Sequence, residues 1–364
     1  MRAGVGMAAN GTLWHCRLRW TAFAAVALGA LLAGCATQPP TDVRVAIGAA
    51  SAGDFRAVDY AALYAPYAMM ATAAYVEPAD FNRANCPDPS LLTRPVADAS
   101  EATYRASVRD WIRQLHGRGW GCDFGVYGNL PCPPRAGVKC KPVGGLQFHV
   151  WRRIEGGRCR EAVIAFRGTD KTDRGDWASN FRWLYRLAPK FDQYAQVQAH
   201  ITQIVARIKK NGCGPGAEFV AVGHSLGGGL AQQAAYADES NSIRYVYAFD
   251  PSPVTGFFDV SAIVLAKSTD GLGVDRAYEA GEILALPRAI IENIYPPAEC
   301  RPRVRTVRFN LLTGFGFSQH KIADLTDRLI VTAKTRGANA RRVNDALRAR
   351  ACKGGPALLM VPPA

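Results

Sequence analysis

The chain has 364 residues, 49% hydrophobic and 20% charged, which excludes wholesale disorder and provides ample core for one large α/β domain or two smaller ones. Its formal net charge of +14 comes mainly from scattered arginines. Neither arginine run beyond residue 300 is interleaved with aromatic residues, so we expect a basic face or attraction to anionic lipid headgroups and no nucleic-acid partner.

The first 34 residues have the pattern of a secretory signal, and they are excluded from the expected fold. Arg17 and Arg19 form a positive flank before an apolar stretch at residues 21–33. That stretch is too short to span a bilayer as a stable helix. The pattern therefore predicts export of the chain.

A cysteine closes this signal. Residues 32–35 read Leu-Ala-Gly-Cys, which resembles a bacterial lipobox, and the resemblance implies cleavage before Cys35 and acylation of its thiol. The non-acidic Ala36 implies, by the same resemblance, the outer membrane. We therefore expect a membrane-anchored lipoprotein of the cell envelope, facing the periplasm or the exterior, with residues 35–57 as its tether.

The remaining cysteines agree with export. Outside the signal and the lipobox there are eight, and an even number in an exported chain predicts up to four disulfides. They are Cys86, Cys122, Cys132, Cys140, Cys159, Cys213, Cys300 and Cys352. Their spacing fixes no pairing, contains no C-x-x-C pair and fits no common zinc module, so we expect no metal site.

The pattern of apolar residues predicts an alternation of helices and strands. Helical spacing occurs at residues 60–76, 101–116, 192–210 and 226–237. Apolar or alternating runs predict strands at 146–154, 161–166, 219–222, 244–249, 277–284 and 303–309. This order predicts an α/β fold with a mainly parallel central sheet flanked by helices.

We expect one domain at residues 58–330. It contains a cysteine-rich insert at 117–142, which we interpret as a stapled loop or small hairpin. Residues 331–364 form a basic tail that packs on the domain or follows it.

The most informative stretch is residues 217–229, A-E-F-V-A-V-G-H-S-L-G-G-G. A buried strand runs into Gly-His-Ser-Leu-Gly and then into a helix, which is the context of a nucleophile elbow. Ser225 is expected at a strained turn with positive φ, and Gly223 and Gly227 have no Cβ to clash there. The alternative is a serine in an ordinary glycine-rich turn.

A nucleophilic serine needs a base, and the base needs an orienting acid. In hydrolases with this elbow the acid and then the histidine follow the serine along the chain. His320 is the one histidine after Ser225, and His224 is too close in the elbow to turn back onto the hydroxyl. Elimination therefore favours His320 as the base. Glu282 is the preferred acid, and Asp250, which ends the preceding strand, is the alternative.

The oxyanion hole is expected to use two backbone N–H groups. One is that of Leu226, which follows the nucleophile. The other is that of Thr169, in Arg-Gly-Thr at 167–169 after an earlier strand, where Gly168 lets the backbone approach closely. The alternative for 167–169 is a simple strand-ending turn with a surface arginine.

These motifs together resemble the class 3, or fungal-type, lipases of the α/β-hydrolase superfamily. The pieces are V-I-A-F-R-G-T-D at 163–170, D-W-A-S-N-F at 176–181, G-H-S-L-G-G at 223–228, A-F-D-P-S-P-V-T-G at 248–256, G-E-I-L-A-L-P at 281–287, and His320. The resemblance implies Ser225 as nucleophile, His320 as base and the Thr169 and Leu226 amides as oxyanion donors, with no cofactor. Glu282 stands where the family usually has Asp, and Asp250 where it usually has Gly.

The expected function is hydrolysis of carboxylic esters of lipids, as a lipase or esterase that works through an acyl-enzyme. Two alternatives stay open: an acyltransferase with the same triad, and a non-enzymatic envelope lipoprotein that uses the fold as a binding module. Trp177, Phe181, Leu184 and Ala188 recur at helical spacing. They could form a mobile lid over the serine or pack into the core.

Overall fold

The computed structural model describes residues 44–47, 50–51, 57–133, 145–168, 192–285, 301–314 and 316–334. The chain divides into two units, Met1–Pro39 and Pro40–Ala364, and all described residues belong to the second. Among these residues, no helix is both long and apolar enough to cross a membrane. The predicted signal, the lipobox with Cys35 and the tail beyond residue 334 lie outside the described residues.

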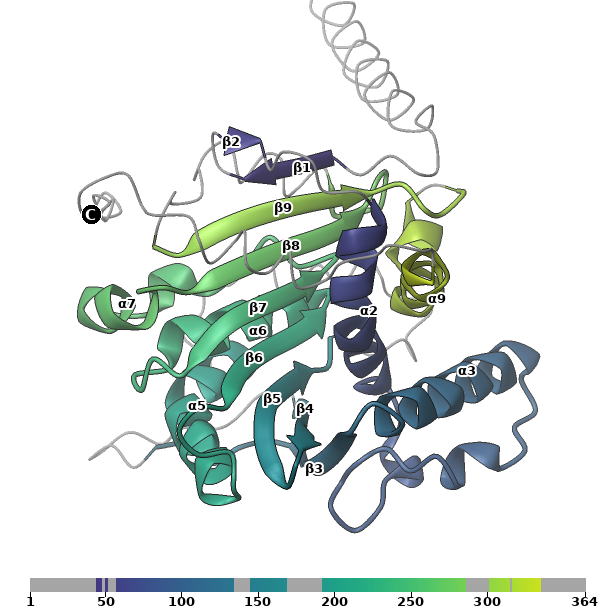
Figure 1. Cartoon of the computed structure of the whole chain (residues 1–364), viewed down its shortest axis with the longest axis horizontal. Coiled ribbons are helices and arrows are strands. Elements are labelled where there is room, and N and C mark those ends of the chain that lie inside the picture. Colours follow the sequence, from purple (N-terminus) through teal and green to yellow (C-terminus); the bar gives the residue numbers. More distant parts are fainter. Residues whose placement is uncertain are drawn as a thin grey trace, which may run out of the picture. The chain divides into compact units, whose positions relative to one another are not determined.

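A single sheet organises the domain (Figure 1). In the described part of the chain it has nine strands in the order β2-β1-β9-β8-β7-β6-β5-β4-β3. They are β1 Arg44–Ile47, β2 Ala50–Ser51, β3 Trp120–Gly128, β4 Leu146–Glu155, β5 Arg158–Phe166, β6 Glu218–His224, β7 Ile243–Phe249, β8 Gly273–Glu279 and β9 Arg303–Phe309. Neighbouring strands from β5 to β9 run parallel, and the strands outside them pair antiparallel. The predicted α/β fold with a mainly parallel central sheet is therefore confirmed.

Helices cover both faces of this sheet (Figure 1). One face carries α2 Ala57–Ala73, α3 Ala99–His116 and α9 Ile322–Ala333, and the other carries α5 Gln193–Lys210, α6 Leu226–Ala237 and α7 Ala262–Ser268. Along β6, Val220 and Val222 join the core under α2 and α9, whereas Phe219 and Ala221 join the core under α5 and α6. Because successive side chains of a strand point to opposite faces, a strand buried on both must be apolar throughout. This explains the continuous apolar run that predicted it.

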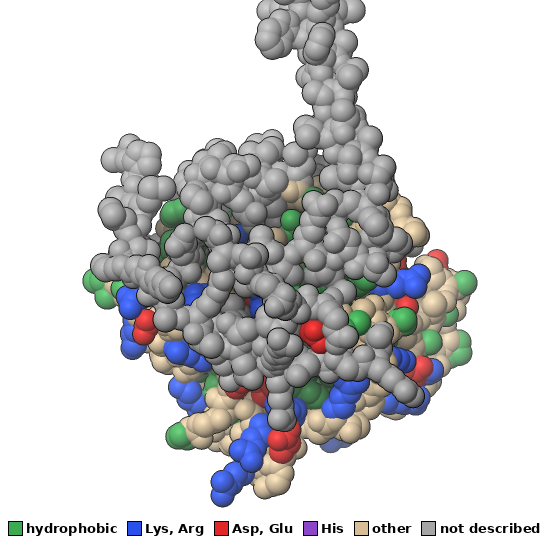
Figure 2. Space-filling model, turned by 45° about the horizontal axis from the view of Figure 1, so that its top comes forward, with side chains coloured by type: hydrophobic (Ala, Val, Ile, Leu, Met, Phe, Trp, Pro, Cys, Tyr) green, Lys and Arg blue, Asp and Glu red, His purple; other side chains and the backbone are tan. Residues whose placement is uncertain are grey.

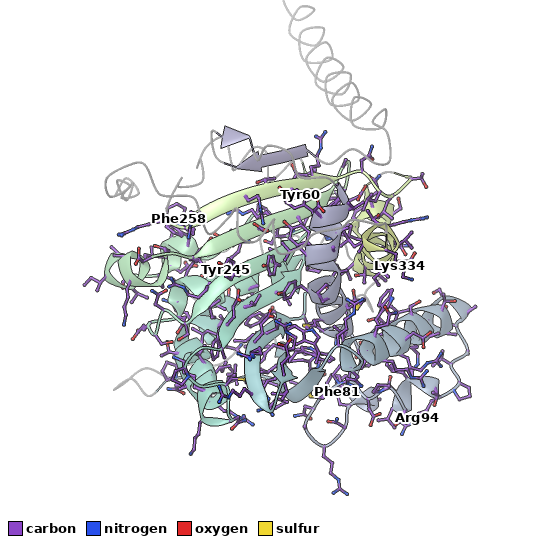
Figure 3. All side chains as sticks on the ribbon, in the orientation of Figure 1. Tyr60, Phe81, Arg94, Tyr245, Phe258 and Lys334 are labelled. Atoms are coloured by element: carbon purple, nitrogen blue, oxygen red, sulfur yellow. A yellow bond between two sulfur atoms is a disulfide. The ribbon has the colours of Figure 1, made fainter. Side chains whose placement is uncertain are left out.

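Helix α2 is the main cover of its face. Tyr60 of α2 and Tyr245 of β7, both labelled in Figure 3, belong to one core cluster. The hydroxyl of Tyr64 donates to Asp275 on β8 at 2.7 Å. Asp275 is also paired with Arg305 on β9, and both side chains are 1% exposed. Because buried charges must be paired and hydrogen-bonded, this contact ties α2 to two specific strands.

The N-terminal edge differs from the expected tether. Arg44–Ile47 forms β1, which pairs antiparallel with β9, and Ala50–Ser51 forms β2 beside it. Part of the stretch predicted as a tether therefore extends the sheet. The short length of these strands explains why no alternating pattern indicated them.

The cysteine-rich insert also contributes to the sheet. Instead of a separate loop or small hairpin, Trp120–Gly128 forms the edge strand β3, which pairs with β4. Its three glycines and one cysteine interrupt the apolar alternation, so no period of two predicts a strand there. Gly125 is required there, because a Cβ would lie 2.0 Å from the carbonyl oxygen of Asn85.

Two disulfides join described cysteines, in agreement with the prediction of disulfide bonding. Cys86–Cys122 links β3 to the segment between α2 and α3, and Cys159–Cys213 links β5 to the connection before β6. Cys132 is disulfide-bonded as well. The remaining predicted cysteines, Cys140, Cys300 and Cys352, lie outside the described residues.

Figure 2 shows charged side chains on one face of the protein. On the coloured part of that face, Lys and Arg side chains lie among fewer acidic side chains and among hydrophobic and other uncharged ones. Several described arginines are committed to pairs inside the fold, including Arg105 with Asp80 and Arg167 with Glu77. Part of the basic charge therefore stabilises the fold through ion pairs.

Candidate active site

Ser225 stands at the corner between β6 and α6. Its φ of 56° and ψ of −124° place a non-glycine residue in a region that L-residues rarely adopt. The corner is fixed by its own backbone. The Ser225 N–H donates to Phe249 O at 3.0 Å, and its carbonyl accepts the N–H groups of Gly228 at 3.0 Å and Ser252 at 2.9 Å. Strain held in this way by surrounding hydrogen bonds is typical of functional sites.

Two glycines make this corner sterically feasible. A Cβ on Gly223 would lie 2.2 Å from the carbonyl oxygen of Gly227. A Cβ on Gly227 would lie 2.4 Å from the carbonyl oxygen of Phe166, at the end of β5. The close approach of strand and helix, which the motif predicts, therefore excludes any side chain at both positions.

His320 reaches the serine from the segment before α9. It ends the short helix η5, Phe317–His320, and its Nε2 lies 3.1 Å from Ser225 Oγ. Its Nδ1 lies 2.8 Å from Glu282 Oε2, and both side chains are buried. Because an ionised carboxylate only accepts, Nδ1 carries the proton and donates to it. Nε2 then presents its lone pair to the Ser225 hydroxyl, which is the arrangement that a general base requires.

Glu282 is held by the turn that follows β8. Its Oε2 also accepts the N–H of Leu284 at 2.8 Å. The Gly316 N–H donates to Gly281 O at 3.0 Å, and an isolated parallel bridge joins Glu282 to Gly316. The acid-bearing turn and the histidine-bearing segment are thus paired through their backbones, although they are far apart in sequence.

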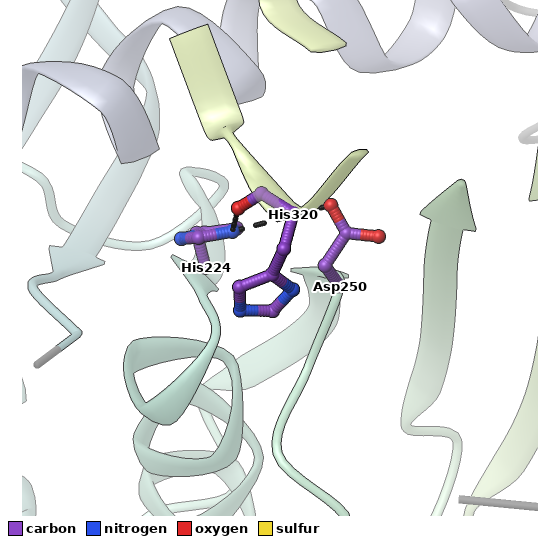
Figure 4. Close-up of side chains that lie close together, drawn as sticks. All are labelled: His224, Asp250 and His320. Atoms are coloured by element: carbon purple, nitrogen blue, oxygen red, sulfur yellow. Dashed lines mark hydrogen bonds and ion pairs between the residues drawn. The ribbon is translucent and has the colours of Figure 1, made fainter. Parts of the chain in front are cut away.

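Asp250, the alternative acid, lies close by but faces other groups. It directly follows β7, has a φ of 38° and is completely buried. Its Oδ1 accepts the N–H of Glu279 at 2.9 Å, and its Oδ2 lies 4.0 Å from His224 Nε2 (Figure 4). The hydrogen bond to Nδ1 of His320 is made by Glu282, the preferred acid of the sequence analysis, and Asp250 stays a prediction without this contact.

His224, Asp250 and His320 also have the composition of a metal-binding set. One potential ligand atom from each lies within 4.8 Å of the others. Both ring nitrogens of His320 nevertheless contact Glu282 and Ser225, and those of His224 contact Tyr75 and the His320 carbonyl. A cation at this cluster would have to replace the hydrogen bonds that orient His320.

Of the two predicted oxyanion donors, only Leu226 lies among the described residues. It is the first residue of α6, so its N–H has no acceptor within the helix and lies at the positive end of the helix dipole. This is where an oxyanion donor is expected beside Ser225. The second predicted donor, Thr169, and the predicted lid residues Trp177, Phe181, Leu184 and Ala188 lie outside the described residues.

The residues just before Thr169 have structural roles that the sequence did not indicate. A Cβ on Gly168 would lie 2.2 Å from Tyr75 Oη and 2.6 Å from His224 O, so this position must be glycine. The alternative of a surface arginine at Arg167 is wrong. Its side chain is buried and donates to Gln147 and Glu77, each at 2.8 Å.

Glu279, at the end of β8, is a further buried acid behind the site. Its Oε1 accepts the N–H groups of Leu311 and Leu312, which begin the segment that leads to His320. Burial raises the pKa of Glu279 from 4.5 to about 8, and the negative charge of Asp250 acts in the same direction. No local pattern marked this residue, because its burial results from the pairing of distant segments.

This raised pKa gives a testable pH dependence of stability. Between pH 4.5 and about 8, native Glu279 holds a proton that the unfolded chain has released. Its contribution to the free energy of unfolding is therefore fully present below pH 4.5 and is lost as pH rises towards 8, by up to about 1.4 kcal/mol per pH unit. Glutamine mimics the protonated acid at every pH. We therefore expect the free energy of unfolding, measured by urea titration, to fall less between pH 5 and pH 8.5 in Glu279→Gln than in the unchanged protein. Parallel pH profiles of the two proteins would contradict the assignment.

Comparison with known protein families finds a match in the middle of the chain. Residues 135–247 match a family model described as phospholipase-like, a Tle-like phospholipase domain. The matched stretch includes β4 to β6, the elbow and most of β7, and it ends before Glu282 and His320. No curated protein shows a significant sequence match to the chain.

Among solved structures, a Pyrobaculum calidifontis esterase in a monoclinic form aligns with 68% of this chain and 98% of its own. The sequences are 12% identical in that alignment, and the TM-score is 0.31. Over residues 135–247, which contain Ser225, this chain is similar to phospholipase-like proteins.

Proposed function

We propose that this protein is a serine hydrolase that cleaves carboxylic ester bonds of lipids. The observation that carries the proposal is the continuous set of contacts from Glu282 through His320 to Ser225, at 2.8 Å and 3.1 Å. A hydroxyl on a strained corner, a base within hydrogen-bonding distance and a buried acid behind the base together constitute an activated nucleophile.

The proposed reaction has two halves. Ser225 Oγ attacks the ester carbonyl carbon while its proton passes to His320 Nε2, and the charge that develops on the carbonyl oxygen is stabilised by the Leu226 and Thr169 amides. His320 then gives this proton to the leaving alcohol as the C–O bond breaks. Water deprotonated by His320 attacks the acyl-enzyme in the same way, which releases the fatty acid and restores Ser225.

Two observations support a lipid substrate. One is the similarity of residues 135–247 to a phospholipase-like domain. The other is the resemblance to class 3 lipases, which extends to the segments that bear Glu282 and His320. A phospholipid is therefore the substrate class to test first, with triglycerides and soluble esters beside it.

The proposal is tested on the chain without residues 1–34. A fluorophosphonate probe should label the protein once per chain, and fatty acid should be released from phosphatidylcholine vesicles, tributyrin emulsion or p-nitrophenyl esters. Product analysis with an acceptor alcohol separates hydrolysis from acyl transfer. A folded protein that neither reacts with the probe nor releases any acid would instead support the non-enzymatic binding module.

We further propose that the protein is exported and anchored to the cell envelope through lipidated Cys35, with the outer membrane as its site. The disulfides Cys86–Cys122 and Cys159–Cys213 suit an oxidising compartment. A Cys35→Ser variant should move from the membrane fraction to the soluble fraction of a bacterial expression host, with its disulfides intact. Retention of this variant in the membrane fraction would contradict the anchor.

A further inference from the structure

The residue before the nucleophile makes contacts that the reaction scheme does not use. His224 is 3% exposed, and its two ring nitrogens contact groups other than Ser225. Its Nδ1 lies 2.9 Å from the hydroxyl of Tyr75, just after α2, and its Nε2 lies 3.1 Å from the main-chain carbonyl oxygen of His320. Figure 4 shows this second contact, with the His224 ring directed at the backbone of His320.

The partner of Nε2 determines the tautomer of the neutral His224 ring. A carbonyl oxygen only accepts, so Nε2 of His224 carries the proton and donates it to His320 O. In the neutral imidazole Nδ1 is then an acceptor, and the Tyr75 hydroxyl donates to it. The same hydroxyl lies 3.3 Å from the carbonyl oxygen of His224. Tyr75 thus orients the His224 ring, as an outer partner orients a functional histidine.

His224 also contacts the side chain of His320. The two rings lie with their centroids 4.8 Å apart and their planes inclined at 43°. His320 is therefore held at two places: Glu282 holds the ring through Nδ1, and His224 holds the main chain and packs on the ring. The contacts with His224 thus add a second restraint on the position of His320, beside the hydrogen bond to Glu282.

We infer that His224 is a positioning residue for His320 and that Tyr75 holds it in the effective orientation. The inference rests on the proposed hydrolase function and assigns these two residues a part in it. The hydrogen bond from His224 Nε2 to the main-chain carbonyl of His320 fixes the position of the base. A displacement of about 1 Å between reacting groups can cost about 100-fold in rate, so losing this hydrogen bond should lower kcat strongly.

Two substitutions of His224 separate positioning from packing. Glutamine places its amide nitrogen near the location of Nε2 and can still donate to His320 O, whereas asparagine reaches only the location of Nδ1. We expect His224→Asn to lower kcat about 100-fold, with KM within about twofold of the unchanged protein. His224→Gln should restore most of that loss, to within about tenfold of the unchanged protein. A residue that only fills space would give no such difference between the two amides.

Tyr75→Phe tests the same idea without altering the elbow. We expect about a tenfold fall in kcat, because the His224 ring loses the donor that orients it. Tyr67→Phe is the matched control. It also removes a buried tyrosine hydroxyl, since Tyr67 of α2 donates to Glu161 at 2.6 Å. That hydrogen bond does not involve Ser225, His320 or Glu282. Tyr67→Phe should therefore leave kcat unchanged, even if it lowers the melting temperature.

All variants are compared on one chromogenic ester after their melting curves have been recorded. An inactive unchanged protein would refute the proposed function itself. If the unchanged protein is active and Ser225→Ala is not, but folded His224→Asn and Tyr75→Phe keep full kcat, the function stands and the inference is wrong. Equal losses in His224→Asn and His224→Gln would also overturn it. Should His224→Asn fail to fold, Tyr75→Phe against Tyr67→Phe decides the question.

Discussion

Ser225→Ala should lower kcat for ester hydrolysis by roughly 10⁶-fold and leave the fold intact. The substitution removes only Oγ, the atom that lies 3.1 Å from His320 Nε2. It keeps the Cβ, so the backbone at φ 56° carries the same strain as before. The hydrogen bonds that fix the corner involve only backbone atoms. Turnover of a chromogenic ester and labelling by a fluorophosphonate measure the loss of the nucleophile. Near-UV circular dichroism shows whether the fold is intact.

Ser225→Gly is the matched control, because it also lacks the hydroxyl but changes the strain. Glycine adopts positive φ without a steric penalty, so this variant should be as inactive as Ser225→Ala and more stable than it by about 1–2 kcal/mol. Urea titration measures the difference. Activity that survives in either variant would refute the nucleophile. Equal stability of the two would show that the corner stores no strain.

Much of the fold could be predicted because its strands carry a simple signal. A parallel strand is apolar along the stretch that is covered on both faces, as at residues 162–166 of β5, 219–222 of β6 and 245–249 of β7. The edge strands β1 and β3 could not be found in this way. β1 is too short to show an alternating pattern. β3 contains Gly125, which is needed for the close approach of Asn85 and adds no apolar side chain to the pattern.

The candidate site was predictable to the extent that local sequence determines it. The elbow motif indicates Ser225 because the strained turn needs glycines at fixed offsets, and a scarcity of histidines singles out His320. The acid was ambiguous, because Asp250 and Glu282 follow the adjacent strands β7 and β8 and both are buried. Side-chain direction, which depends on the turn after each strand, separates them.

The supporting residues were not predictable at all. Tyr75 lies 149 residues before His224 in the sequence. The two residues meet because α2 crosses the sheet at the elbow. Glu279 contacts the His320-bearing segment only because β8 and β9 are neighbours. Such contacts depend on the packing of distant elements, for which a single sequence has no periodic signal.

The choice of acid leads to the second large effect. Glu282→Ala should lower kcat by about 10⁴-fold, since His320 loses both the acceptor for its Nδ1 proton and the charge that stabilises the imidazolium. Glu282→Gln separates these two losses. Oε2 of Glu282 accepts from both His320 Nδ1 and the Leu284 N–H, so a glutamine oxygen at that place keeps both hydrogen bonds. Only the charge is lost, and we expect a fall of about 10²–10³-fold.

Asp250→Asn is the decisive comparison for this assignment. Its oxygen can still accept the Glu279 N–H, and it removes the same unit of charge from a buried position beside the site. A general electrostatic or folding effect would therefore lower activity equally in Asp250→Asn and Glu282→Gln. The charge that is hydrogen-bonded directly to Nδ1 of His320 is lost in Glu282→Gln alone, so we expect Asp250→Asn to retain kcat within about tenfold. Steady-state kinetics on one ester distinguish the two, and a larger fall in Asp250→Asn than in Glu282→Gln would transfer the role of the acid to Asp250.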